Sequence, residues 1–251
     1  MNKVLLLFVF VPFLANSIFG QTLPSLQADR PDQTESAFLV PAKHWQFETG
    51  FTYEKVDDNT NAFQYPTILS KYGVNDFFEL RLITEMVGIK QGNNTISGIS
   101  PLTVGFKAKL SDEKGAFPAA SFIGHISIPD AAGKNFKATY YAPSFRFNLQ
   151  HTLSEKVSLA YNLGAEWDGE TPEPTFLYTL AGGYTFTEKL GGYIELYGFA
   201  PQKSISDHRF DGGLTYLIKK NIMVDISGGM GISKHAPDYY VALGFSFRLK
   251  D

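Results

Sequence analysis

The sequence predicts an all-β fold, a closed antiparallel transmembrane β-barrel of about 12 strands that follows a short N-terminal periplasmic segment. Three observations indicate this fold. Apolar and polar residues alternate from residue 43 onwards, short and long connections take turns, and aromatic residues gather at both ends of the predicted strands. A period of two is typical of strands with one apolar and one polar face. In a membrane, such strands close into a barrel that is apolar outside and polar inside.

The chain before the barrel lacks this alternation. A lysine near the start precedes an apolar run that ends at Leu14, and small and polar residues follow, which predicts a secretory signal peptide over residues 1–20. The apolar run is too short to cross a bilayer as a helix. Residues 21–43 contain three prolines and predict a periplasmic lead-in or partial plug, so the barrel is expected over residues 44–251.

The barrel region divides into twelve predicted strands. In the first, Trp45 and Phe47 share one face while Gln46 and Glu48 share the other, and the later strands repeat this pattern. The second strand is interrupted by Pro66, which leaves its facing open. The predicted strands cover residues 44–55, 63–73, 76–90, 101–110, 117–128, 139–151, 156–167, 175–186, 189–199, 208–218, 221–231 and 239–249.

The connections between these strands alternate in length. Short polar turns are expected at residues 73–76, 111–115, 154–156, 187–189 and 219–221. Mostly longer loops are expected between them, at residues 56–62, 91–100, 129–138, 168–174, 200–207 and 232–238. Short periplasmic turns and longer outer loops are typical of outer-membrane barrels. A soluble β-sandwich, the alternative, has no reason to keep this alternation.

Aromatic residues agree with the same orientation. Trp45 is expected at the periplasmic rim and Trp167 at the outer rim, as in the aromatic girdles of membrane barrels. Ordinary core aromatics would explain the number of these residues but not their pairing at both strand ends.

The polar strand faces are expected to line the lumen, because an Arg or Lys facing hydrocarbon costs about 2–4 kcal/mol near the midplane. These side chains either brace the interior or form a constriction that selects solutes by charge and shape. The two tyrosines among them either fill space or cover a hydrophobic solute. The candidate lining residues are Glu48, Glu79, Arg81, Glu85, Lys107, Lys109, Arg146, Glu166, Tyr193, Glu195, Tyr197 and Asp225.

The lead-in has a charged stretch with two interpretations. Asp, Ser and Thr beside proline favour turns, so the stretch could be a rigid turn that ties the lead-in to the barrel. Alternatively, Asp29, Arg30, Asp32 and Glu35 enter the periplasmic mouth and pair with lumen charges, forming a gate.

Nothing in the sequence indicates catalysis. The five histidines fall at both ends of the predicted barrel and cannot converge on one triad, so no enzyme activity, cofactor or metal site is expected. The net charge of −3 gives no electrostatic footprint for nucleic acid. With no cysteine in the chain, neither a lipoprotein anchor nor a disulfide is expected.

Several stretches resemble one bacterial family. The run from Ala28 to Ser36 (ADRPDQTES) is the most specific, and weaker matches include Val104–Lys107 (VGFK), Glu195–Gly198 (ELYG) and Asp211–Tyr216 (DGGLTY). The chain resembles the "putative MetA-pathway of phenol degradation" family, often called simply "transporter". The resemblance implies an outer-membrane β-barrel linked to uptake of aromatic or other hydrophobic compounds.

These observations together predict a channel in the outer membrane of a Gram-negative bacterium, for passive uptake of small solutes. Its expected partners are outer-membrane lipid, a small-molecule solute and the barrel-assembly machinery, and it is expected to be monomeric. The alternative is a plugged structural or interaction barrel that binds a partner through its outer loops.

Overall fold

The computed structural model describes residues 23–250, which form thirteen strands and no helix. Accordingly, no helix in this range is long and apolar enough to cross a membrane. The predicted signal peptide lies outside the described residues. The strands are β1 (His44–Lys55), β2 (Thr60–Asn75), β3 (Phe78–Gln91), β4 (Asn94–Ile99), β5 (Leu102–Ser111), β6 (Ala119–Ile128), β7 (Ala142–Thr152), β8 (Val157–Glu166), β9 (Thr175–Thr185), β10 (Leu190–Pro201), β11 (Asp207–Lys219), β12 (Ile222–Gly231) and β13 (Tyr239–Lys250).

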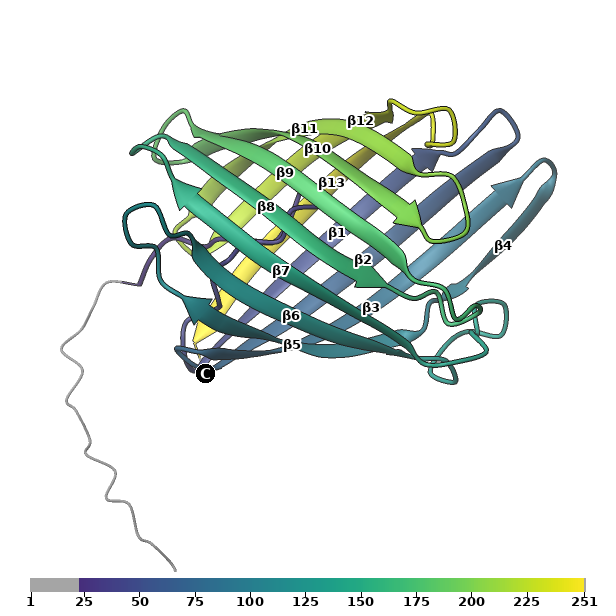
Figure 1. Cartoon of the computed structure of the whole chain (residues 1–251), viewed down its shortest axis with the longest axis horizontal. Coiled ribbons are helices and arrows are strands. Elements are labelled where there is room, and N and C mark those ends of the chain that lie inside the picture. The colour runs from purple at the N-terminus through teal and green to yellow at the C-terminus, as the bar shows by residue number, and fades with distance from the viewer. Residues whose placement is uncertain (1–22, 251) are drawn as a thin grey trace, which may run out of the picture.

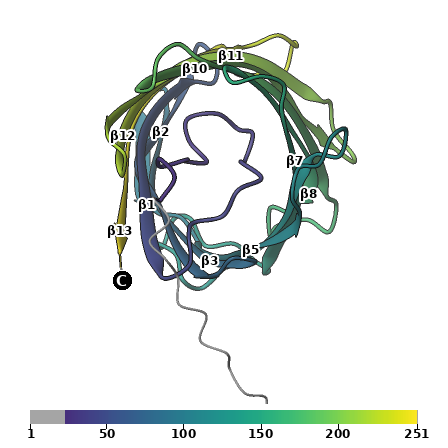
Figure 2. The same cartoon turned by 90° about the vertical axis from the view of Figure 1, so that its left-hand side faces the viewer.

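Twelve of these strands close into an antiparallel barrel (Figures 1 and 2). The first strand, β1, pairs with the last, β13, from His44 opposite Lys250 to Lys55 opposite Tyr239. The ring is completed by the pairing of β2 with β3, while β4 pairs only with β3. The predicted fold class, a closed barrel of about 12 strands, is therefore confirmed.

The additional strand β4 corrects the sequence prediction, which placed residues 91–100 in a loop. β4 pairs with the second half of β3, and β5 pairs with its first half. The two are thus one barrel strand, interrupted at Ser100 and Pro101. Proline has no backbone N–H and cannot donate to the ladder at this point. Gly92, with φ of 57°, makes the tight turn between β3 and β4.

Strand β2 is longer than predicted and irregular around Pro66. Its pairing with β3 slips between Gln64 and Thr67, as expected where proline interrupts a ladder. After this bulge the register is regular and places Lys71 opposite both Gln46 and Arg81. The bulge therefore determines the facing that the sequence left open, with Lys71 buried in the interior.

Burial is inverted relative to a soluble domain. Outward apolar side chains are exposed, as with Ile194 at 62% and Leu243 at 57%, whereas the inward Glu79 and Lys107 are at 0%. This is the arrangement of a barrel whose solvent outside is lipid. Trp45 packs on an outer-wall tyrosine near one rim, with ring centroids 4.7 Å apart, and aromatic pairs also occur near the other rim.

Residues 23–43, called here the internal segment, run through the barrel interior. The segment lies inside the ring of strands in the view along the barrel (Figure 2). At the end where β1 begins and β13 ends, called here the terminal end, Leu26 donates a backbone hydrogen bond to Lys220, and Lys43 donates one to Gly73. The opposite end, which carries the β3–β4 hairpin, is called the loop end (Figure 1).

Candidate functional site in the barrel lumen

The internal segment is bound on one side by a cluster of buried charges. Asp29 accepts hydrogen bonds from Lys71 at 2.9 Å, Arg81 at 3.0 Å and Lys107 at 2.9 Å. Arg81 also binds both carboxylate oxygens of Glu35, at 2.9 and 3.1 Å. We call this the anchor cluster; it comprises Asp29, Glu35, Glu48, Lys71, Glu79, Arg81 and Lys107.

The strand period places the wall members of this cluster together. Glu79 and Arg81 are two residues apart on β3 and so share its inner face. The antiparallel register sets Lys107 of β5 opposite Glu79 and Lys71 of β2 opposite Arg81. Four charges from three strands thereby meet at one height in the lumen.

The cations of the cluster set the pKa of Asp29. Burial alone would raise the pKa of the Asp29 carboxyl, but Lys107, Lys71 and Arg81 outweigh it and hold the pKa well below its ordinary value. Breaking a buried ion pair by removing one partner typically costs about 3–5 kcal/mol, because the other charge is left uncompensated. The anchor cluster is therefore a strong attachment for the segment.

Wall carboxylates also bind the backbone of the segment. Val40 donates its N–H to Glu79 at 2.7 Å, and Asp29 donates its N–H to Glu48 at 2.9 Å. Lys107 donates to the carbonyl of Ser36 at 3.0 Å. The segment has no helix or strand to satisfy these groups, so the wall supplies the partners that a buried backbone requires.

The other side of the segment is bound by neutral groups. Glu35 donates its N–H to Asn162 Oδ1 at 2.6 Å, and Asn162 Nδ2 returns a bond to the Glu35 carbonyl at 3.0 Å. The hydroxyls of Thr34 and Thr179 lie 2.6 Å apart, and Ala37 donates to Gln150 at 3.3 Å. These contacts with β7, β8 and β9 are called the neutral edge.

A third set of contacts joins the segment to β10 and β12. Gln33 donates its N–H to Glu195 at 2.8 Å, and Arg30 pairs with Asp225 at 3.1 Å. Asp32 makes none of the ion pairs found among residues 23–250. Burial, followed by the charge of Glu195, raises the pKa of Asp32 well above its ordinary value.

A ring of inward polar side chains is buried at mid-height, where the segment runs through the lumen. Each of the twelve barrel strands contributes an inward polar side chain that is at most 6% exposed. The ring, from β1 through β13 without β4, is Glu48, Lys71, Arg81, Lys107, Ser121, Asn148, Asn162, Thr179, Glu195, Asp211, Asp225 and Ser246.

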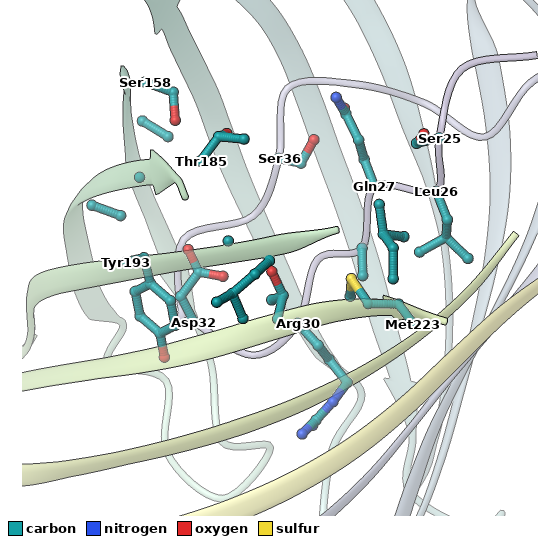
Figure 3. Close-up of a pocket in the computed structure, with 18 of the residues that line it drawn as sticks. Ser25, Leu26, Gln27, Arg30, Asp32, Ser36, Ser158, Thr185, Tyr193 and Met223 are labelled. Carbon is teal, nitrogen blue, oxygen red and sulfur yellow. The ribbon is translucent and has the colours of Figure 1, made fainter. Parts of the chain in front are cut away.

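Cavities lie on both sides of this ring. At the terminal end, a cavity of about 370 Å³ separates the segment from β8–β12 and is lined by Arg30, Asp32 and Tyr193, among others (Figure 3). A second, of about 460 Å³, lies between the segment and the wall near Lys71 and Lys109. At the loop end, a cavity of about 260 Å³ includes Arg146 in its lining.

The structure distributes the remaining predicted lining residues around the lumen. Glu85 accepts from Thr67 at 2.7 Å, and Lys109 pairs with the Asp112 carboxylate at the terminal rim. Glu166 lies 3.9 Å from Arg146 at the loop end. Tyr197 is 2% exposed and packs near the Arg209 guanidinium, 5.9 Å from its ring centroid, so it fills space in this structure.

Some contact residues were not among the predicted ones. Lys71 was missed because Pro66 obscured the facing of β2, and its alternation after the proline is the signal that could have found it. Asn162 and Thr34 carry no charge, so nothing in the sequence distinguishes them from other polar residues. No group of three metal-ligating side chains occurs within residues 23–250.

The fold is shared with solved outer-membrane barrels. The COG4313 outer membrane channel from Pseudomonas putida F1 matches with a TM-score of 0.70 and 12% identity, over 85% of this chain and 98% of that one. The KdgM porin matches with a TM-score of 0.55 and 11% identity, over 80% and 98%. The NanC porin matches with a TM-score of 0.53 and 10% identity, over 82% and 100%. At these identities the likeness shows the fold alone.

Sequence comparison supplies the family. No curated protein matches the chain. The model of one family, described as "Putative MetA-pathway of phenol degradation", matches residues 28–249, which include most of the internal segment and nearly the whole barrel. The chain therefore belongs to this family, as the ADRPDQTES run and the weaker matching stretches predict.

Proposed function

We propose that the protein is a Gram-negative outer-membrane channel for passive uptake of small solutes, and that the internal segment is its plug. The observation that carries the proposal is the buried ring at mid-height, with cavities on both sides of it. The wall between these cavities is continuous, so the segment is the part that must move for a solute to cross. The solved barrels that share the fold include an outer membrane channel and a porin, which supports this proposal.

The plug opens along its neutral edge. A neutral hydrogen bond contributes about 0.5–1.5 kcal/mol net, whereas separating a buried ion pair costs several times more. The contacts of Asn162, Thr179 and Gln150 therefore break while the anchor cluster holds. In this proposal Asp29 and Glu35 anchor the gate, and Arg30 holds it through Asp225. Asp32 favours opening because burial, and then the charge of Glu195, oppose its ionised form.

The proposal also covers the orientation and surroundings of the channel. The terminal end, with its short turns, faces the periplasm, and the protein works as a monomer in outer-membrane lipid after insertion by the barrel-assembly machinery. The channel has no catalytic role and takes up solutes by diffusion, with aromatic or hydrophobic solutes as one class that the family implies. The complete burial of the ring favours one alternative, a permanently plugged barrel that binds a partner through its outer loops.

Replacement of Asn162 by Ala should open the channel. The variant loses both hydrogen bonds to Glu35, so the neutral edge weakens while the anchor cluster is unchanged. Liposome swelling with charged, neutral and aromatic solutes is expected to be faster for Asn162→Ala than for the wild type. In planar bilayers the variant should show longer open intervals.

The matched control is Asn148→Ala. Asn148 lies opposite Asn162 in the β7–β8 register and is equally buried, but it binds Ser121 of the wall. Its replacement should leave swelling close to the wild-type rate. Equal effects of the two variants would contradict the neutral edge as the gate, and no permeation by either would favour the interaction barrel.

Mild acid should close the channel. The pKa of Asp32 is higher when the plug is docked than its ordinary value of 3.8. Protonation of Asp32 therefore stabilises the docked plug fully at pH values below 3.8, and this stabilisation is lost as the pH rises through the docked pKa. Open probability in planar bilayers should therefore fall as the pH is lowered from 7 towards that value. The carboxylates that face Asp32 are Glu195, Asp211 and Asp29.

Asp32→Asn tests the assignment. The variant carries no charge at any pH, so it should be more closed than the wild type at neutral pH and should respond less to acid. Burial also raises the pKa of Glu35, which leaves part of the response in place. A full wild-type response in Asp32→Asn would show that another group is responsible.

A further inference from the structure

The loop-end cavity lies on the side of the plug that faces outside the cell in the proposed orientation. Its volume of about 260 Å³ lies just below the roughly 300–1,000 Å³ of typical small-molecule sites, so it suits one small solute. We call it the outer pocket; the lining residues used below are Glu35, His125, Ser144, Arg146, Glu166 and Trp167.

Arg146 is bound differently from the three cations of the anchor cluster. The side chains of Lys71, Arg81 and Lys107 are at most 3% exposed, and each pairs with carboxylates. Arg146 is 20% exposed and donates to a neutral group, the Gln33 carbonyl, at 3.0 Å. A guanidinium has five N–H donors, so Arg146 has capacity for a further acceptor.

The two carboxylates of the pocket oppose an anion only weakly. Glu35 is held by two bonds from Arg81, and Lys107 lies 3.7 Å from it, so its charge is compensated. Glu166 lies 3.9 Å from Arg146 with its side chain 37% exposed, and water screens a pair of this kind. Arg146 can therefore exchange this partner for a carboxylate that enters the pocket.

The wall beside Arg146 offers further polar and apolar contacts. His125 of β6 lies opposite Ser144 of β7, and its buried Nε2 has no hydrogen-bond partner among residues 23–250. Trp167 donates its indole N–H to the Pro172 carbonyl at 3.1 Å, which fixes the ring at the pocket. A guanidinium, an imidazole and a hydroxyl next to an indole suit a carboxylate with a short apolar body.

We infer that the outer pocket binds small carboxylates and that Arg146 is the residue that selects them. The inference rests on the proposed channel function and adds a solute class to it. Arg146 holds Gln33, the neighbour of Thr34 and Glu35 at the neutral edge. A carboxylate that binds the guanidinium therefore lies beside the closed side of the plug.

Binding can be measured without transport. The chain has two tryptophans, and Trp45 lies at the terminal end, so the Trp45→Phe variant leaves Trp167 as the reporter in the pocket. Titration of the detergent-solubilised variant with butyrate should change Trp167 fluorescence, whereas neutral butyramide should have little effect. Adding Arg146→Gln should weaken butyrate binding by about tenfold or more, as expected for loss of a charge-assisted bond.

Transport gives the second readout. In planar bilayers, Arg146→Gln should lose the preference for butyrate over butyramide, and Glu166→Gln should strengthen it because the competing carboxylate is removed. Lys114→Gln, which removes an exposed cation in the β5–β6 turn at the terminal end, is the control and should leave the preference unchanged.

The outcomes separate the two proposals. Equal binding of butyrate and butyramide, or butyrate binding unaffected by Arg146→Gln, would overturn the selectivity inference even if the channel conducts. Absence of conductance in the wild type and in the open variants would instead remove the channel function.

Discussion

Deletion of residues 21–36 is expected to raise single-channel conductance several-fold in planar bilayers. The deletion removes Asp29, Glu35 and the neutral-edge contacts of Thr34 and Glu35, so most of the segment at mid-height is lost from the lumen. An open twelve-stranded barrel is narrow, but without the plug its lumen fills with water. The measurement is the conductance of the deletion variant against that of the chain without the deletion, in the same salt.

The barrel itself should survive this deletion. Every barrel strand keeps both neighbours, because the ring closes through β1–β13 and β2–β3 pairing without the internal segment. Lys71 keeps its ion pair with Glu48 and Arg81 keeps its ion pair with Glu79. Lys107 loses Asp29 and Glu35 but lies opposite Glu79 in the strand register. An uncompensated buried charge is costly only where water is excluded. In the deletion variant water enters the lumen and solvates these cations, so the cost is reduced.

Retained strand content in circular dichroism and a heat-modifiable gel mobility would show that the variant folds. Unchanged conductance in a folded variant would remove the segment as the gate. It would also favour the rigid-turn interpretation of the lead-in.

The sequence predicts the wall well because each strand obeys a local rule. Alternation assigns Glu79, Arg81 and Lys107 to the inside whatever their partners are, since any other facing puts charge in lipid. β4 escaped this rule because its six residues are too few for a clear period next to Pro101. The pairing of Lys71 with Asp29 could not be predicted for a different reason. It depends on the register shift between β2 and β3 at Pro66.

The course of the internal segment could not be predicted in this way. The segment has no period, and its conformation is set by wall groups that are far away in sequence, such as Asn162 and Glu195. The charges in the ADRPDQTES run could suggest contact with the lumen, but not which wall each would meet. Which wall group each charge meets decides whether a contact belongs to the anchor cluster or to the edge that can open. Only the three-dimensional structure supplies this information.

Asp29→Asn is expected to open the channel strongly. Asp29 accepts from three buried cations, and the amide that replaces it carries no charge to balance them. A loss of about 3–5 kcal/mol from the docked plug would raise the undocked population by about a hundredfold or more. Single-channel open probability reports this change directly.

A chemical probe gives an independent readout. The chain has no cysteine, so Ala37→Cys introduces a single thiol at a position that is 4% exposed when the plug is docked. A small water-soluble thiol reagent should modify this residue much faster when Asp29→Asn is added. Equal modification rates would contradict the anchoring role.

The sharpest comparison sets Asp29→Asn against Asp32→Asn. The two substitutions are the same chemically and lie three residues apart, yet opposite signs are expected. Asp29 is surrounded by cations that stabilise its charge, whereas the nearest charges to Asp32 are carboxylates that oppose it. The first variant should open the channel and the second should close it. A general disturbance of the segment would move both in the same direction, so only opposite shifts in open probability support a plug held by the anchor cluster and loosened beside Glu195.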